Sequence, residues 1–453
     1  MTADANAKQQ SGQQPAVSEG WTAYFRMGER KTNVRTEILA GITSFLASAY
    51  LLVVIPSLLS AGGIDRAAAT TAVILVIVGA TLFMALYANL PFVVGPGIGG
   101  SVLVGPTMAA VEHIPWQVGL AIAFWSSVIF VLLTVLGIRQ VIARMVPTQI
   151  KLGLGAAIGL FIALLGFKNA GLVDVNVKSH ALMLGSFASP QALVAVFGVF
   201  LAVFLRGRNV PGPILWAILG GTLLGIPLGI TKIPENFFGM PHGIETTAFQ
   251  LDFLGALKIQ YFPYLFAFFA SEFFSTLGTT LAVGAKAGLV DEEGNMEDLG
   301  KPFLVDSIAA TISPLLGIPS ATALVESATG AEAGGRTGFA SLATAAMFAL
   351  TLLFTPIALM IPAAATAPAL ILVGMSMFSA LRLVDLENFT DGLSALMMVL
   401  LTLVSNSFGT GIAGGLLFYV AVKVLSGEAK QVSIGMYVLA IPLAYYFWTV
   451  AAH

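Results

Sequence analysis

Cysteine is absent from the 453-residue chain, and charged residues make up only 10% of it. The absence of cysteine excludes disulfide bonds, thiolate metal sites and a cysteine nucleophile. The four histidines are scattered and lack the spacing of metal ligands, so we expect no metal and no cofactor. The formal net charge of −2 argues against nucleic acid as a partner.

Long apolar runs, in contrast, are abundant. Hydrophobic residues form 57% of the chain, and its mean hydropathy is +0.91. An ordinary soluble domain has too small a core to bury that many apolar side chains. Because a helix needs about 20 apolar residues to cross a bilayer, the sequence predicts an all-α polytopic membrane protein in a lipid bilayer, with about 14 transmembrane segments.

The expected segments are 37–60, 67–88, 91–110, 115–137, 149–168, 190–206, 211–231, 260–284, 302–317, 319–335, 337–361, 366–383, 391–404 and 407–425. The third and the tenth are rich in glycine, proline or other small residues, so neither is expected to form one regular helix. A further apolar segment, 434–450, either crosses the bilayer or lies flat on it.

The N-terminal region has a different composition. Residues 1–19 are polar and are expected to be disordered. Trp21–Arg35 combines aromatic and basic side chains, which is typical of a helix lying at the inner membrane surface. The short loops containing Arg206, Arg208 and Arg336 fall on the same side as this basic segment. Lysine and arginine in short loops favour the cytoplasm. We therefore expect a protein of the cell (inner) membrane whose N-terminus lies in the cytoplasm.

The two interrupted segments take the third place in successive sets of seven spans. Their sequences are GPGIGGSV from Gly95 and GIPSATALVES from Gly317. Because seven is odd, the second half must enter the membrane from the opposite side, which predicts a 7+7 inverted repeat. Paired interrupted helices point to the transport site of a secondary transporter, where half-helix N-termini face each other near the midplane.

Three acids lie within the apolar segments. A charged side chain at a helix centre costs roughly 2.5 to 3.5 kcal/mol, so each is a candidate functional residue. Glu272 lies in the eighth segment and Glu326 at the break of the tenth, where the structural alternative is a bond to backbone or to Arg336. Asp306, in the ninth segment, belongs either to a proton relay or, as we favour, to a structural bond with Ser307 or a neighbouring span.

Four stretches are the most distinctive, namely YANLPFVVGPGIG from Tyr87, KLGLGAAIGLFIALLGFKNAGLV from Lys151, LGTTLAVGAKAGLVDEEG from Leu277 and VESATGAEAGGRTG from Val325. In these stretches, and over nearly the whole apolar body, the sequence resembles the nucleobase–cation symporter-2 family in its adenine/guanine/hypoxanthine permease branch. The resemblance implies proton-coupled nucleobase uptake, often by a homodimer, through movement of a core domain against a gate domain in an elevator-like mechanism. It also implies that the acids matching Glu272 and Glu326 hold the base.

The same resemblance divides the chain into five parts. These are 1–35 (cytoplasmic tail and interfacial helix), 36–138 (first core part), 139–258 (first gate part with an outer loop), 259–362 (second core part) and 363–453 (second gate part with the last apolar segment). The core then contains spans 1 to 4 and 8 to 11, and the gate contains spans 5 to 7 and 12 to 14.

A purine presents its N–H donors and exocyclic groups in one plane, so a carboxylate that accepts two N–H bonds can bind it. The candidate substrate-binding residues are Glu272, Glu326, Thr276, Ser275, Ser101, Gly100, Val325, Thr322, Phe45 and Tyr50. The candidates for proton coupling are Glu272, Glu326 and Asp306, and the sequence leaves open which of them carries the proton.

Four positions depart from the family branch. It usually has Asp in place of Glu272, Asp in place of Ser275, Asn in place of Ser101, and Asn in place of Ile55 before the proline of the first span. Several polar contacts to the base are therefore altered. These four changes therefore bear more on which base is transported than on the expectation that the protein is a nucleobase transporter.

We expect a proton-coupled purine nucleobase symporter. The alternatives are a carrier of the same fold for xanthine or uracil, or for a small anion. Two acids at the binding site would repel an anion, which favours an uncharged substrate. No nucleophile–base pair, metal cluster or ring of like side chains occurs in the spans, so the sequence predicts neither an enzyme with catalytic residues nor a channel.

Overall fold

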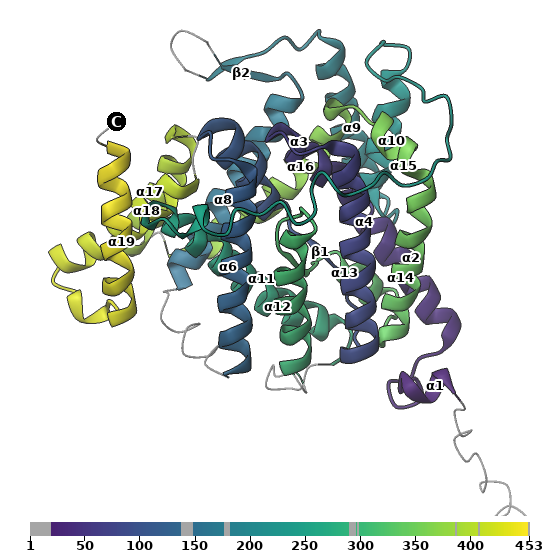
Figure 1. Ribbon diagram of the computed structural model, residues 1–453, viewed down its shortest axis with the longest axis horizontal. Helices are drawn as coiled ribbons and strands as arrows, with labels where there is room; N and C mark the ends of the chain where they lie inside the picture. Colours follow the sequence, from purple (N-terminus) through teal and green to yellow (C-terminus); the bar gives the residue numbers. More distant parts are fainter. Residues whose placement is uncertain are drawn as a thin grey trace, which may run out of the picture.

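The computed structural model describes residues 20–136, 148–175, 182–289, 296, 299–385, 387–405 and 408–451. The predicted tail, 1–19, lies outside the described residues. The chain is mostly helical, as predicted (Figure 1). By length and composition, seven described helical stretches are apolar enough to cross a membrane, namely Val34–Ala61, Arg66–Ala88, Trp116–Val135, Gln149–Asn169, Pro190–Gly207, Gly338–Met360 and Ala363–Leu383.

The first half of the chain contains α1 (Trp21–Tyr24), α2 (Val34–Ser48), α3 (Leu51–Ala61), α4 (Arg66–Phe83), η1 (Met84–Ala88), β1 (Val94–Pro96), α5 (Ile98–Val102), η2 (Leu103–Val111), α6 (Trp116–Val135), α8 (Thr148–Asn169), β2 (Val173–Val175), β3 (Leu182–Leu184), α9 (Pro190–Gly207) and α10 (Pro213–Gly225).

The second half contains η3 (Gly255–Leu257), η4 (Ile259–Tyr261), α11 (Phe262–Lys286), α12 (Gly300–Leu315), β4 (Ala321–Ala323), α13 (Ser327–Glu332), α14 (Gly338–Thr351), η5 (Leu352–Phe354), α15 (Thr355–Met360), α16 (Ala363–Phe378), η6 (Ser379–Leu383), α17 (Phe389–Ser405), α18 (Phe408–Leu425), η7 (Ala429–Gln431) and α19 (Ile434–Ala451).

Most of these helices begin and end within a few residues of the ranges predicted from apolar runs. Two differ more. Helix α10 ends at Gly225 although its apolar run continues to 231, because Pro227 lacks a backbone donor and Gly229 has a positive φ of 74°. The helix predicted over Trp21–Arg35 is the single turn α1, since the backbone takes positive φ values at Arg26 (56°) and Lys31 (52°).

Side chains near the N-terminus complete the ends of distant helices. Arg30 donates through Nη1 to the carbonyl oxygens of Asn89 (2.6 Å) and Arg336 (2.7 Å). The buried Glu37 of α2 accepts backbone N–H bonds from Arg336 (2.9 Å), Thr337 (3.3 Å) and Ala340 (3.1 Å). These amides lie at the N-terminal end of α14, where backbone N–H groups lack the carbonyl partners of a full helical turn, so Glu37 caps α14. The Ala340 N–H also bonds to the carbonyl oxygen of Thr337 at 3.2 Å.

The helices pack mainly within two groups, and we call them group A and group B. In group A, α14 packs on α2 and α4, α3 on α4, and α6 on α11 and α12. In group B, α16 packs on α8, α9 and α10, and α17 packs on α8 and α18. Figure 1 shows α17, α18 and α19 at one side of the molecule and α1, α2 and α14 at the other.

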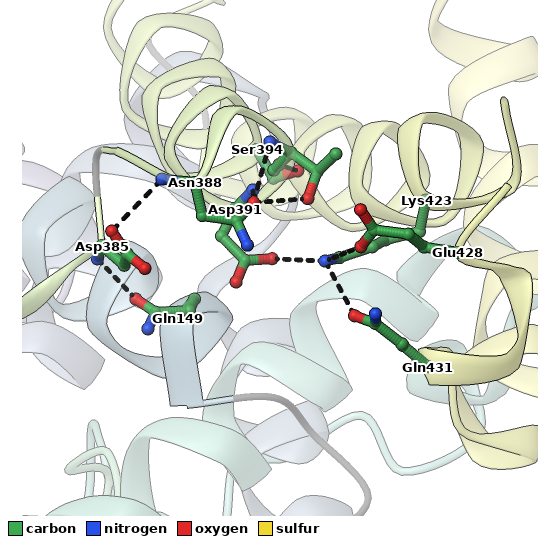
Figure 2. Close-up of polar contacts among 9 residues, drawn as sticks. Gln149, Asp385, Asn388, Asp391, Ser394, Lys423, Glu428 and Gln431 are labelled. Carbon is green, nitrogen blue, oxygen red and sulfur yellow. Dashed lines mark hydrogen bonds and ion pairs between the residues drawn. The ribbon is translucent and has the colours of Figure 1, made fainter. Parts of the chain in front are cut away.

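In group B, a buried lysine connects α17, α18 and the chain that follows α18 through ion pairs and a hydrogen bond (Figure 2). Lys423 of α18 has a side chain that is only 3% exposed, and its ammonium group lies 3.2 Å from Asp391 Oδ1 and 2.7 Å from Glu428 Oε2. It also donates to Gln431 Oε1 at 3.2 Å. Because a buried ammonium is stable only with such partners, Lys423 ties the start of α17 to the end of α18 and to the chain that follows.

Two three-residue strands interrupt the helical architecture of group A. Strands β1 and β4 pair in antiparallel register, with Val94 opposite Ala323, Gly95 opposite Thr322 and Pro96 opposite Ala321. All six residues are buried, and each strand is followed by a short helix, α5 or α13. Mutual pairing satisfies backbone groups that lipid could not. A second two-stranded sheet, β2 with β3, lies near one end of the molecule (Figure 1).

Candidate functional site

A cavity of about 1030 Å³ lies where the two groups of helices meet. Group A contributes residues of α2, α11 and the segments containing β1 and β4, and group B contributes residues of α9, α10 and α16. From Glu272 the cavity extends to the exposed Arg206 and Asn209, next to the connection between α9 and α10. The predicted residues that line it are Tyr50, Gly100, Glu272, Ser275, Thr322, Val325 and Glu326.

Four predicted residues are not among those lining the cavity. Ser101 is fully buried and donates to the carbonyl oxygen of Gly97 at 3.0 Å. Phe45 packs edge-on against Phe348, with ring centroids 5.0 Å apart. Asp306 and Thr276 are both fully buried behind the cavity wall and bond to each other. These four residues therefore support the wall rather than face the cavity.

Glu326 precedes α13 and lines the cavity beside the exposed Val325. The hydroxyl of Tyr50, between α2 and α3, donates to Glu326 Oε1 at 2.6 Å. Two structural alternatives were considered for Glu326. The carboxylate does interact with backbone, namely its own N–H, whereas the bond to Arg336 is not present. Arg336 instead donates through Nη1 to the carbonyl oxygens of Ala331 (2.6 Å) and Gly335 (2.9 Å).

Glu272 of α11 lies deeper in the cavity wall. Ser127 of α6 donates to Glu272 Oε2 at 3.2 Å, and the Ser127 and Ser320 hydroxyl oxygens are also 3.2 Å apart. Glu272 Oε1 is buried and has no hydrogen-bond partner among the described residues. The sequence did not point to Ser127, because a pair of serines such as Ser126 and Ser127 in an apolar helix does not by itself indicate a functional site. Ser320 lies in the interrupted segment GIPSATALVES, and only this location in the sequence suggested that it is near the site.

Asp306 of α12 holds β4 in place from behind. Its Oδ2 accepts from the backbone N–H of Ala323 (2.9 Å) and from the hydroxyls of Thr276 (2.9 Å) and Thr322 (3.2 Å). Ser307, the other partner considered, donates instead to the carbonyl oxygen of Leu304. Asp306 thereby joins α11, α12 and β4, and two of its partners, Thr322 and Ala323, line the cavity.

The charges around the cavity are mostly negative. Glu272, Glu326 and Glu332 line it together with Arg206, and Glu332 forms an ion pair with Lys286. The acids Glu272 and Glu326 have no basic partner among the described residues. Carboxylate oxygens only accept hydrogen bonds when ionised, so the cavity suits an uncharged ligand that offers N–H donors. It disfavours an anion.

Comparison with known proteins places the chain among permeases. A sequence model described as a permease family matches residues 35–425. A Methanocaldococcus jannaschii protein named only as a permease is 39% identical, covering 94% of this chain and 97% of its own. The adenine permease AdeP of Escherichia coli is 31% identical (92% and 93%), and the guanine/hypoxanthine permease GhxP of E. coli O157:H7 is 32% identical (94% and 96%).

Solved structures share the fold at low sequence identity. The transmembrane domain of the cyanobacterial bicarbonate transporter BicA superposes with a TM-score of 0.64 at 17% identity, covering 82% of this chain and 96% of that one. SLC26A9 superposes with a TM-score of 0.62 at 13% identity, covering 90% of this chain and 67% of that one. At such identities the similarity concerns the fold alone.

Proposed function

Because the chain belongs to the nucleobase–cation symporter-2 permease family, we propose that it imports purine nucleobases of the guanine, hypoxanthine and adenine class together with protons. Its family and relatives make it a multi-pass membrane permease rather than an enzyme. The adenine and guanine/hypoxanthine permeases among those relatives support a purine as the substrate.

The observation that carries the proposal is that two carboxylates without basic partners among the described residues face one cavity. Glu326 and Glu272 supply hydrogen-bond acceptors, and Gly99, Gly100 and Ser275 leave space beside them. A flat, uncharged purine offers ring N–H groups that such acceptors bind in its plane. The ring then lies between the β1 and β4 segments on one side and α16 on the other.

We also propose that one of these acids carries the coupling proton. Glu272 is the better placed, because its Oε1 has no partner among the described residues and Ser127 holds its other oxygen. Glu326 is then left to bind the base. Because the two acids face the same cavity, their protonation is expected to be coupled.

The proposed mechanism moves group A, as the core domain (36–138 and 259–362), against group B, as the gate domain (139–258 and 363–453). We propose 14 crossings, with the β1–α5 and β4–α13 segments as the interrupted third and tenth. The cavity between the groups reaches the α9–α10 connection, which the loop charges assign to the cytoplasm, so this conformation faces inward. An inner-membrane location, a cytoplasmic N-terminus and a homodimer complete the proposal.

Two alternatives keep the same fold. Xanthine or uracil would use the same acceptors, and the altered positions Ser101, Ser275 and Glu272 leave the choice of base open. A small anion, such as the bicarbonate that gives the BicA transporter its description, would have to approach Glu272 and Glu326. The two acids therefore favour a nucleobase.

Uptake of labelled hypoxanthine, guanine, adenine, xanthine and uracil into cells expressing the protein tests the proposal. We expect purine accumulation that a protonophore abolishes. Purine accumulation unaffected by the protonophore would reject proton coupling, and the absence of uptake of every base would reject the transport function. Glu272→Gln keeps one acceptor oxygen, so it should retain purine binding and lose proton-driven accumulation. Loss of binding in that variant would mean that Glu272 serves mainly the base rather than the proton.

A further inference from the structure

The buried Tyr50 and the partly buried Glu326 form a hydrogen-bonded pair at the edge of the cavity. Tyr50 is 1% exposed, both residues line the cavity, and the Tyr50 hydroxyl oxygen lies 2.6 Å from Glu326 Oε1. Among the described residues no other side chain donates a hydrogen bond to the Glu326 carboxylate, which otherwise interacts with its own backbone N–H. Such a short bond to a charged acceptor is stronger than one between neutral groups. Glu326 thus has one carboxylate oxygen engaged by the protein before any ligand arrives.

That bond changes what the cavity offers to a ligand. A tyrosine hydroxyl has a single hydrogen, and Tyr50 donates it to Oε1. The Tyr50 oxygen can then only accept, and Oε1 has lost part of its capacity to accept. Oε2 remains the strongest acceptor that this pair presents. A ligand edge with one N–H donor is well matched, whereas an edge with two parallel N–H donors must compete with the Tyr50 hydroxyl.

We propose that Tyr50 is a specificity-determining residue, which makes Glu326 bind purines with one N–H donor at the engaged edge in preference to purines with two. The inference rests on the proposed function, because it takes Glu326 as the residue that binds the base. Tyr50 acts through Glu326, so it is a positioning residue rather than a stacking platform for the ring.

Purine chemistry provides matched ligands. Hypoxanthine and guanine both carry N1–H, and guanine adds a 2-amino group, which gives two parallel donors. Adenine and 2,6-diaminopurine differ by the same 2-amino group, but their N1 is an acceptor, so no parallel pair arises. The first pair therefore detects competition for the Glu326 carboxylate, and the second controls for the size of the added amino group.

The experiment measures the dissociation constants of all four purines for the full-length wild type and for Tyr50→Phe, purified in detergent. Phenylalanine keeps the ring and removes only the hydroxyl. We expect the guanine-to-hypoxanthine affinity ratio to rise about tenfold, the factor that about 1.4 kcal/mol represents. The ratio of 2,6-diaminopurine to adenine should stay within about twofold of the wild-type value.

Tyr264→Phe is the matched control, because Tyr264 is equally buried, lies on α11 outside the cavity lining and packs against Tyr446. It should change neither ratio. If Tyr50→Phe only disturbed packing, it would weaken the binding of all four purines alike and leave both affinity ratios unchanged, which would overturn the proposal. An equal increase in affinity for all four purines would also overturn it, since it would mean that every base displaces the Tyr50 hydroxyl. Failure of the wild type to bind any purine would instead reject the proposed function.

Discussion

The two halves of the molecule hold their short strands in different ways. In the first half, the hydroxyl of Thr81 on α4 donates to the carbonyl oxygen of Val94 (3.2 Å) and accepts from its N–H (3.1 Å). In the second half, Asp306 on α12 accepts three hydrogen bonds from β4, α11 and the Thr322 side chain. A hydroxyl satisfies both groups of one residue, whereas a carboxylate gathers donors from several segments. The second half therefore uses an acidic side chain to hold its strand, whereas the first half uses a neutral hydroxyl.

The difference extends into the cavity. The β1–β4 register is centred on Gly95 opposite Thr322, so the position four residues after this pair is Gly99 in one half and Glu326 in the other. Both residues line the cavity. The first half thus contributes space and the second half contributes hydrogen-bond acceptors, although the two segments share a strand-then-helix plan.

The largest effect is expected for Asp306→Ala. Its removal leaves two buried donors without an acceptor, the Ala323 N–H and one of the Thr276 and Thr322 hydroxyls, which can bond to each other across 3.1 Å. At roughly 1 to 1.5 kcal/mol each, the protein should lose about 2 to 3 kcal/mol of stability. Thermal unfolding in detergent measures the loss. An unchanged melting temperature would show that Asp306 does not hold β4, and the comparison with Thr81 would fail.

Glu326→Gln should follow, with about a thirtyfold loss of purine affinity, because a hydrogen bond to a charged acceptor contributes about 2 kcal/mol. Equilibrium binding of hypoxanthine measures it. The control is Glu332→Gln, which alters an acid at the exposed part of the same cavity that is already paired with Lys286. Equal losses in both variants would indicate a general effect of charge rather than contact with the base.

Thr81→Val should cost about 1 to 2 kcal/mol of stability, less than Asp306→Ala, because valine keeps the shape and leaves only the Val94 groups unpaired. The same thermal measurement applies. Thr81→Ser, which keeps the hydroxyl, is the matched control and should unfold close to the wild type. A larger loss for Thr81→Val than for Asp306→Ala would reverse the ranking of the two halves.

Gly99→Ala should have the smallest effect, less than about threefold on purine affinity. A Cβ atom at Gly99 would meet Ile158 at 3.5 Å and Ser271 at 3.9 Å, which are ordinary contacts. Binding assays across the purine panel measure the change. Loss of affinity comparable with that of Glu326→Gln would mean that the first half contacts the base as closely as the second.

Helix positions were predictable because each long apolar run is itself the cause of a membrane helix. The pairing of β1 with β4 was not predictable. Strands of three residues are too short to show an alternation of apolar and polar side chains, and the paired residues lie over 200 positions apart in the sequence. For the same reason the sequence identified Glu326 and Glu272 as unusual without revealing their partners Tyr50 and Ser127. Phe45 was misleading because an aromatic that packs on another helix has the same local pattern as one facing a ligand.

The cap that Glu37 places on α14 has a consequence for biosynthesis. The amides it binds lie 299 to 303 residues further along the chain. At about 5 to 20 residues per second, roughly 15 to 60 seconds separate the emergence of this carboxylate from the ribosome and that of its partners. The helix that carries Glu37 is thus inserted early, but its side-chain contacts with α14 form only late in synthesis. Until then, water or the insertion machinery must solvate the Glu37 carboxylate.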